Sequence, residues 1–362
     1  MQKLFSVLIA LFLVPFVSNA KSTKFTLKGT VSDTTSGFVL IRNLARPLPD
    51  TIQITNGEFT YSDVIDEPVP FVITDERNRY QMFFAEPGAK MQMTLARKEM
   101  QVIFIGGSAA HDIFRKLIVA QDPWQKMRQP IQQAFSQPNA NKDSLQAILM
   151  MIGNKTNENF YSFLKENGQT EVAAFLIYSS ISNERSIDAK IADSMFSFLN
   201  GKGLTCFYGQ ETKKSIEKLR AVTIGYMAPD FTLPDSTQKK MYSLSQFRGK
   251  YVLVDFWASW CGPCKAEIPF LKEAYAEFHD KGFDILSVSL DDKRENWMNS
   301  IRQFKMPWTQ VSDCKGFRST VNDLYPSPSI PKTLLLDKTG KIIAADLRGK
   351  ALDAKLKELL EK

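Results

Sequence analysis

Two cysteines separated by two residues follow directly after a buried-strand pattern, and this feature constrains the chain more than any other. The pattern is the apolar run Val252 to Trp257, and the cysteines are Cys261 and Cys264, with Gly262-Pro263 between them. Thiols at this spacing can close a small disulfide ring and open it again. The pair therefore indicates thiol-disulfide exchange rather than a structural crosslink, and the rest of the chain must position it.

Cys261 is the predicted nucleophile of the pair. It precedes a helix that begins at Gly262-Pro263-Cys264, where unpaired backbone N–H groups and the helix dipole favour negative charge. Proline is tolerated in that first turn because it gives up a donor that would be unpaired anyway. A thiolate attacks a disulfide and a thiol does not. Cys264, one helical turn further on and facing inward, is then placed to resolve the mixed disulfide.

Asp255 is the only acidic residue in the apolar strand before the dithiol. Burying a carboxylate without a partner is costly, so an acid in this position suggests a purpose. We expect it to lie behind Cys264 and to accept the proton of that thiol. The alternative is an aspartate on an edge strand that faces solvent.

Other chemistries are disfavoured by the residues around the cysteines. Zinc would need a second pair of cysteines or histidines, and neither His111 nor His279 provides one. A covalent haem would need a histidine where Lys265 stands. We therefore expect no metal and no cofactor. The net charge is +7, but the sequence contains no block of five like charges, which argues against nucleic acid as a partner.

The two other cysteines, Cys206 and Cys314, have no evident role in the motif. Four cysteines in 362 residues are too few for a disulfide-stapled scaffold, so hydrophobic cores must hold the folds together. Cys206 and Cys314 could pair with each other, receive electrons from the dithiol, or remain as buried free thiols. We favour the last of these.

The first 20 residues have the pattern of a cleaved export signal. Lys3 precedes an apolar run from Leu4 to Val17, and small residues stand at Ser18 and Ala20. The alternative, an uncleaved membrane anchor, would need a longer apolar run. Export would place the protein in the periplasm or cell envelope, where free thiols tend to oxidise to disulfides.

Three further segments give a multidomain chain. Residues 21–107 alternate with period two and carry the hairpin turn Asn56-Gly57, which predicts a small antiparallel β domain of six to eight strands. Residues 108–222 have helical periodicity, and Gly201-Lys202-Gly203 is expected to break the chain before a helix over about 211–222. Residues 223–362 alternate strands and helices, with a strand over 251–257, a helix over about 264–279 and a hairpin turn at 338–341, which predicts an α/β domain.

Asp255 to Lys265 resembles the active-site strand, turn and helix of thioredoxins. The stretch from about Ile224 to Lys362 resembles the TlpA/ResA-like thioredoxin modules of bacterial envelopes, and the likeness includes Ala228-Pro229-Asp230-Phe231, Glu267-Ile268-Pro269 and the turn at 338–341. The resemblance implies a thioredoxin fold. The segment from Phe25 to about Leu117 is more weakly similar to a β domain of unknown function found ahead of such modules, which implies an accessory role in docking or dimer contacts.

The same resemblance implies where a substrate would bind. Pro331 after Ile330 would be the cis-proline whose preceding backbone pairs with a bound substrate chain, although Pro326 and Pro328 are close competitors. Trp260, Gly262 and Pro263 would complete this surface around the dithiol.

The expected activity is that of an exported thiol-disulfide oxidoreductase that reduces disulfides in envelope proteins. Gly262-Pro263 is the dipeptide typical of reductants in the thioredoxin family. The alternatives are a disulfide isomerase or oxidase, or a binding module with an inert redox site. A peroxidase of the peroxiredoxin type is disfavoured because a Thr-x-x-Cys arrangement is missing. The partners would be protein or peptide disulfides and an electron donor in the membrane or envelope, and the oligomeric state, with a dimer among the possibilities, is left open.

Overall fold

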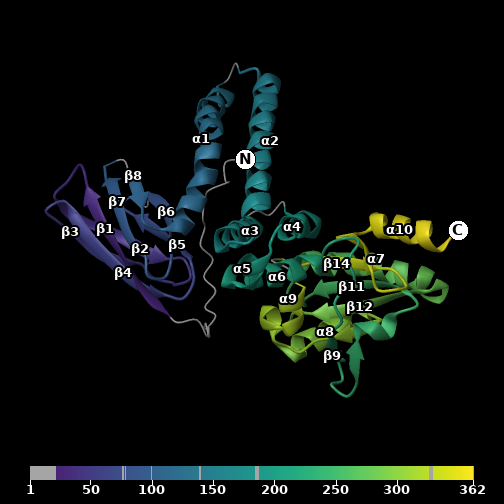
Figure 1. Ribbon diagram of the computed structural model, residues 1–362. Helices are drawn as coiled ribbons and strands as arrows, with labels where there is room; N and C mark the ends of the chain where they lie inside the picture. Colours follow the sequence, from purple (N-terminus) through teal and green to yellow (C-terminus); the bar gives the residue numbers. More distant parts are fainter. Residues whose placement is uncertain are drawn as a thin grey trace. The chain divides into compact units, whose positions relative to one another are not determined.

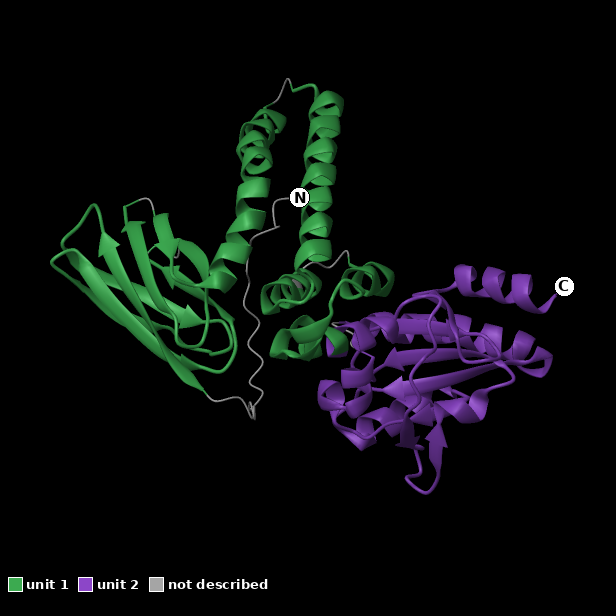
Figure 2. Ribbon diagram, in the orientation of Figure 1, with its two compact units in different colours: residues 1–213 green, residues 214–362 purple. Residues whose placement is uncertain are grey.

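The computed structural model describes residues 22–75, 77, 79–98, 100–137, 140–183, 187–325 and 329–361. The chain divides into two compact units, residues 1–213 and 214–362 (Figure 2). The expected export signal, residues 1–20, lies outside the described residues. In the described part of the chain, the helices are too short or too polar to cross a membrane.

The first unit begins with an eight-stranded sheet in the order β6-β5-β2-β3-β4-β1-β7-β8 (Figure 1). The turn between β3 and β4 is the predicted hairpin, since Asn56 and Gly57 have φ of 53° and 78°. Large apolar side chains alternate into one core, in which the ring centroids of Phe25 and Phe71 lie 5.1 Å apart. The strands are β1 (Thr23–Val31), β2 (Ser36–Asn43), β3 (Asp50–Thr55), β4 (Glu58–Ile65), β5 (Val69–Thr74), β6 (Tyr80–Ala85), β7 (Lys90–Ala96) and β8 (Gln101–Gly106).

The prediction of a purely antiparallel domain is wrong at one pair of strands. β1 and β7 run parallel, in a register from Thr26 opposite Lys90 to Val31 opposite Leu95. β4 already occupies the other side of β1 in the antiparallel direction. β7 reaches the free side of β1 only after the β5–β6 hairpin. Alternation of apolar residues reports which face a side chain occupies, and it does not report the direction of the neighbouring strand.

Helices follow the sheet in the described residues up to Arg220. Figure 1 shows α1 and α2 side by side as a long hairpin, and Ser108 caps α1 by accepting the His111 N–H. Phe84 of β6 contacts the rings of Phe114 in α1 and Phe175 in α3, which attaches the helices to the sheet. The helices are α1 (Ala109–Phe135), α2 (Lys142–Asn167), α3 (Glu171–Asn183), α4 (Ala189–Phe196), α5 (Gly201–Thr205) and α6 (Phe207–Arg220).

The prediction that Gly201-Lys202-Gly203 breaks the helical pattern is wrong, because α5 begins there. The glycines allow close approach of backbone. A Cβ on Gly203 would lie 2.2 Å from the Gly168 carbonyl oxygen, and one on Gly209 would lie 2.1 Å from the Gly203 carbonyl oxygen. This segment therefore needs glycine for packing rather than for a chain break.

The second unit has a five-stranded sheet in the order β13-β12-β11-β14-β15. β11, β12 and β13 are parallel, whereas β14 runs antiparallel to β11 and to β15. β14 and β15 form the predicted hairpin around residues 338–341. The strands are β11 (Tyr251–Trp257), β12 (Phe283–Ser289), β13 (Thr309–Val311), β14 (Lys332–Leu336) and β15 (Ile342–Ala345), with a separate pair β9 (Thr232–Pro234) and β10 (Met241–Ser243).

Both faces of this sheet are covered, so β11 is buried on each side. Leu253 and Trp257 enter one core, while Val252, Val254 and Phe256 enter the other. The first core also takes side chains from α7 (Gly262–Phe278), α8 (Arg294–Phe304) and α10 (Lys350–Leu360), and the second takes Val321 from α9 (Thr320–Leu324). A central strand between helices is the thioredoxin arrangement that the sequence implies.

Alanine substitutions at a closely packed glycine and at an unpacked glycine should change the stability of the chain in opposite directions. Gly203→Ala should lower the free energy of unfolding by about 2 kcal/mol, because the added methyl overlaps the Gly168 carbonyl group. Gly153→Ala in α2 is the matched control. Nothing lies within 4 Å of its added Cβ, so it should stabilise the chain by about 0.5–1 kcal/mol. Urea unfolding of both variants tests this, and equal effects would contradict the packing role of Gly203.

Candidate active site

The dithiol lies where β11 ends and α7 begins. Cys261 and Cys264 form a disulfide with an S–S distance of 2.03 Å and a Cα–Cα distance of 5.3 Å. Cys261 is the N-cap residue of α7, and its Sγ accepts the Cys264 backbone N–H at 3.1 Å. Only 5% of Cys261 and 3% of Cys264 is exposed, whereas Gly262 and Pro263 between them are exposed. The sulfurs therefore lie just beneath the surface, with a helix N-terminus directed at Cys261.

Asp255 lies on the face of β11 that carries the dithiol. It stands between Leu253 and Trp257, which share a core with both cysteines, and side chains on a strand alternate between faces. Asp255 is 4% exposed and belongs to a central strand, so the edge-strand alternative is wrong. Its Oδ2 accepts the Ser287 Oγ–H at 2.9 Å.

Burial raises the pKa of Asp255 to about 7. The hydrogen bond from Ser287 opposes this rise, because it stabilises the charged form. The negative charge of Glu267 raises the pKa further, and the positive charge of Arg348 lowers it. A carboxyl with this pKa can take or release a proton near neutral pH.

Ile330 and Pro331 lie beside the end of β11 that leads to the dithiol. Lys332, the next residue, stands opposite Phe256 in the register of β14 with β11. The Ile330–Pro331 peptide bond is cis, and the Arg348 guanidinium donates to the Pro331 carbonyl oxygen at 2.6 Å. The two competing prolines, 326 and 328, lie outside the described residues. The structure thus brings Ile330-Pro331 to the same end of the sheet as the dithiol.

Trp260, immediately before Cys261, is 54% exposed. Its ring centroid lies 6.0 Å from that of Phe317, which is also exposed. Phe317 has no motif around it in the sequence, and only the fold places it next to the active-site turn.

Asp291 is a second residue that the sequence analysis missed. Its carboxylate accepts the Ser259 N–H at 2.9 Å, the Ser259 Oγ–H at 2.5 Å and the Ser289 Oγ–H at 2.7 Å, and it is 1% exposed. Ser259 belongs to the turn that leads to Cys261. Asp291 therefore fixes this turn to the end of β12. The signal for it in the sequence is an acid directly after the apolar run from Phe283 to Leu290, which is typical of a strand.

Cys206 and Cys314 are free thiols in the structure. Cys206 is buried in the first unit, and desolvation raises its pKa to about 12. Desolvation also raises the pKa of the half-buried Cys314. Raised pKa values make both thiols weak nucleophiles at neutral pH. Among the described residues, histidine, cysteine and acidic side chains do not gather in any group of three or more that could hold a metal.

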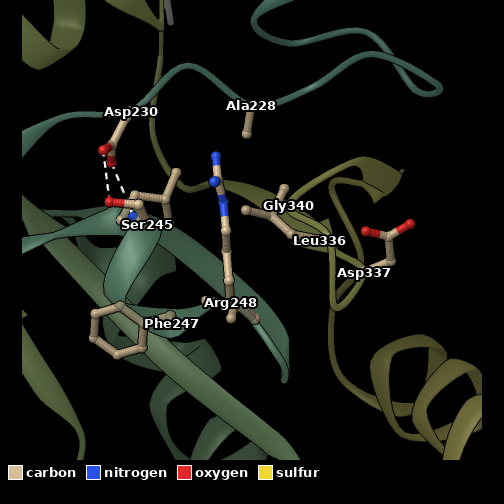
Figure 3. Close-up of a pocket in the computed structure, with 10 residues that line it drawn as sticks. Ala228, Asp230, Ser245, Phe247, Arg248, Leu336, Asp337 and Gly340 are labelled. Atoms are coloured by element: carbon tan, nitrogen blue, oxygen red, sulfur yellow. Dashed lines mark hydrogen bonds between the residues drawn. The ribbon is translucent and has the colours of Figure 1, made fainter.

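A small cavity lies at the opposite end of β11 from the dithiol. Figure 3 shows Arg248 extending into it, and Asp230 accepting hydrogen bonds from Ser245. Its volume of about 10 Å³ leaves room for no more than one water molecule. This cavity is too small for a substrate. It is lined by Ala228, Asp230, Leu244, Ser245, Phe247, Arg248, Val252, Leu336, Asp337 and Gly340.

Comparison with known proteins separates the chain into two regions. Residues 224–345 match the AhpC/TSA family, and residues 25–114 match a domain of unknown function, DUF4369. The chain is 32% identical over 160 residues to the thiol-disulfide oxidoreductase ResA of Bacillus thuringiensis. The aligned residues make up 44% of this chain and 87% of that protein. The chain belongs to the ResA-related thiol-disulfide oxidoreductases.

A second ResA and a solved structure are also similar to part of the chain. ResA of Oceanobacillus iheyensis is 35% identical over 122 residues, or 33% of this chain and 62% of that protein. A thiol-disulfide oxidoreductase of Bacteroides fragilis is 41% identical, covering 37% of this chain and 99% of that chain, with a TM-score of 0.35. As a ResA-related oxidoreductase, the chain itself is an enzyme, and its thioredoxin fold lies in the C-terminal region. Its N-terminal region contains the domain of unknown function.

The raised pKa of Asp255 predicts a pH-dependent stability. The folded chain keeps a proton on Asp255 that the unfolded chain releases above about pH 4, so the free energy of unfolding falls as pH rises from about 4 through 7. Asp255→Asn removes the titrating group and with it this fall in the free energy of unfolding. At pH 8 the oxidised variant should be more stable than the native chain, by up to about 4 kcal/mol, and the difference should shrink at pH 5.

Urea unfolding of the oxidised proteins at pH 5 and pH 8 measures this difference. Asp280→Asn, at an exposed carboxylate in the same unit, is the control and should follow the native chain. The same stability change on going from pH 5 to pH 8 in Asp255→Asn and native protein would contradict the raised pKa.

Loss of the Asp291 carboxylate should disturb the turn before Cys261. Asp291→Ala leaves two hydroxyls and a backbone N–H without their acceptor, which should cost about 1–3 kcal/mol of stability. We also expect disulfide-exchange activity to fall several-fold. Asp292→Ala is a matched control, since Asp292 follows Asp291 directly and is exposed. Denaturant unfolding and insulin reduction report the two effects, and similar behaviour of both variants would refute this role for Asp291.

Proposed function

We propose that this protein is an exported reductase that reduces disulfide bonds in envelope proteins, with Cys261 as the attacking thiol. The observation that carries the proposal is the contact between Cys261 Sγ and the Cys264 backbone N–H at the start of α7. A sulfur held there is stabilised as a thiolate by an N–H group and by the helix dipole. Export is proposed from the pattern of residues 1–20, and it implies a location in the periplasm or cell envelope.

The reaction begins with the dithiol reduced. The Cys261 thiolate attacks one sulfur of the substrate disulfide, forming a mixed disulfide, and the other substrate sulfur leaves with the bonding electron pair and takes up a proton. Cys264 then gives its proton to Asp255 and attacks Cys261 Sγ. The second substrate sulfur leaves and is protonated in turn. The products are a substrate dithiol and the Cys261–Cys264 disulfide, which is the state of the structure.

The proton acceptor must lie on the side of the buried thiol. Asp255 occupies the face of β11 that packs with Cys264, and its pKa of about 7 suits both uptake and release of a proton at neutral pH. Return of the dithiol to its reduced form requires two electrons and two protons, which we assign to a thiol donor in the membrane or envelope.

Substrate is proposed to bind across the exposed residues around the sulfurs. Trp260, Gly262 and Pro263 are exposed on one side, and Ile330 and Pro331 are partly exposed beside the end of β11. An extended peptide can pair its backbone with the backbone before a proline at this position. The segments 21–107 and 108–222 are proposed as accessory domains, with residues 223–362 as the catalytic domain.

Substitution by serine should have different effects on activity at the two cysteines. Cys261→Ser should reduce insulin disulfides no faster than the uncatalysed reaction, because the attacking sulfur is lost. Cys264→Ser should accumulate mixed disulfides with substrate, because nothing resolves them. The measurements are insulin turbidity with dithiothreitol, and mass spectrometry of proteins captured by the Cys264→Ser variant in an envelope extract.

Cys314→Ser provides a matched control, since it removes a half-buried thiol of the same unit and should retain native activity. Turnover by Cys261→Ser at the native rate would overturn the assignment of the nucleophile. The reduction potential of the dithiol tests the direction of the reaction. A value near that of thioredoxin supports a reductase, and a value near that of a strong oxidant refutes it.

A further inference from the structure

Three buried side chains from three segments form a chain of hydrogen bonds behind the dithiol. Trp308, just before β13, donates its Nε1–H to Ser287 Oγ at 2.8 Å. Ser287, on β12, donates its Oγ–H to Asp255 Oδ2 at 2.9 Å. Ser287 stands directly opposite Asp255 in the register of the two strands, and the three residues are at most 5% exposed.

The indole determines the direction of this chain. Tryptophan has one N–H and no acceptor, so Ser287 Oγ must accept from Trp308. The Ser287 hydroxyl has a single proton, and Asp255 Oδ2 is the acceptor to which the structure directs it. Oδ2 is therefore the acceptor of this contact in the charged form of Asp255, and Oδ1 lies outside the contact.

We propose that Ser287 and Trp308 are positioning residues that set the proton affinity of Asp255. They hold Oδ2 as a fixed acceptor and leave Oδ1 to take the proton of Cys264. When that S–H proton moves to Oδ1, the Cys264 thiolate is free to attack Cys261 Sγ, and the substrate sulfur leaves with the electron pair. This inference rests on the proposed function, in which Asp255 is the proton acceptor.

The other groups that face Asp255 act on it from outside this contact. Glu267 and Cys264 belong to α7, which packs on this face of β11, and the Glu267 carboxylate accepts the Gly349 N–H at 2.9 Å. Arg348 is exposed and donates to the Pro331 carbonyl oxygen.

Thr333 stands opposite Asp255 on β14, but its hydroxyl donates to the Leu347 carbonyl oxygen at 3.1 Å. Glu267 and Arg348 shift the pKa of Asp255 in opposite directions. The hydrogen bond from Ser287 is therefore the local contact that limits the rise caused by burial.

The test is the titration of the Asp255 carboxyl carbon by NMR in the oxidised full chain, where neither Cys261 nor Cys264 titrates. Ser287→Ala removes a hydrogen bond to the charged form, so the proton affinity of Asp255 should rise roughly tenfold. Trp308→Phe leaves Ser287 in place but frees its hydroxyl to turn, so the rise should be smaller, about threefold. Ser300→Ala deletes a buried hydroxyl of α8 and should leave the titration unchanged.

An unchanged or lower proton affinity in Ser287→Ala overturns the proposal. If that variant does not fold, an unchanged titration in Trp308→Phe overturns it instead. A structural effect alone would alter stability without moving the titration of Asp255.

A kinetic measurement separates this inference from the proposed function. The mixed disulfide of Cys261 with nitrothiobenzoate releases a coloured thiolate when Cys264 resolves it, and its rate is followed against pH. The midpoint should move to higher pH in Ser287→Ala. In an Asp255→Asn background, Ser287→Ala should no longer move it.

The two failures are distinguishable. A raised proton affinity of Asp255 with an unmoved kinetic midpoint would refute Asp255 as the proton acceptor, while the effect of Ser287 on Asp255 would stand. A moved midpoint that persists in the Asp255→Asn background would refute action through Asp255.

Discussion

The contact of Cys261 Sγ with the backbone N–H of Cys264 is the interaction on which the second unit depends for its chemistry. It requires a helix to begin at the residue after Cys261, a strand to end a short turn before it, and that turn to be held in place. The fold supplies each condition. Burial of β11 between two cores fixes the end of the strand, Pro263 fits the first turn of α7, and Asp291 holds the turn through Ser259. The reactive sulfur is thus positioned by backbone as well as by side chains.

Local patterns predicted the parts of the structure that depend on near neighbours. The strand 251–257 and the start of the helix after it follow from a short apolar run and from a proline two residues after the N-cap, and the Asn56-Gly57 turn follows from its positive φ angles. The parallel pairing of β1 with β7 joins segments about 60 residues apart, and no local period specifies it. Ser287 and Trp308 were missed for the same reason. A serine in an apolar strand and a tryptophan before a short strand look like ordinary core residues until the register places them behind Asp255.

The N-terminal sheet and the helices after it are joined by packing and by carboxylates. The ring of Phe84 contacts those of Phe114 and Phe175. Glu86 accepts the N–H groups of the first two residues of α1 at 3.0 and 3.3 Å. Glu67, between β4 and β5, accepts the Phe207 N–H at the start of α6 at 3.1 Å. Unpaired N–H groups at helix N-termini favour such acceptors. The sheet and the helices therefore share contacts that a substitution in either would disturb, which favours keeping them together in any truncation.

The proposed role of Asp255 as proton acceptor sets two opposing requirements on its pKa, and the residues around it meet both. A proton acceptor near neutral pH needs the raised pKa that burial gives, but every step in that direction destabilises the charged form and with it the folded chain at high pH. Complete isolation would make the carboxyl too basic to release its proton again. The Ser287 hydroxyl, oriented by the Trp308 indole, stabilises the charge from inside the sheet, where solvent does not screen it. A neutral donor can do this without placing a second charge beside the Cys264 thiol.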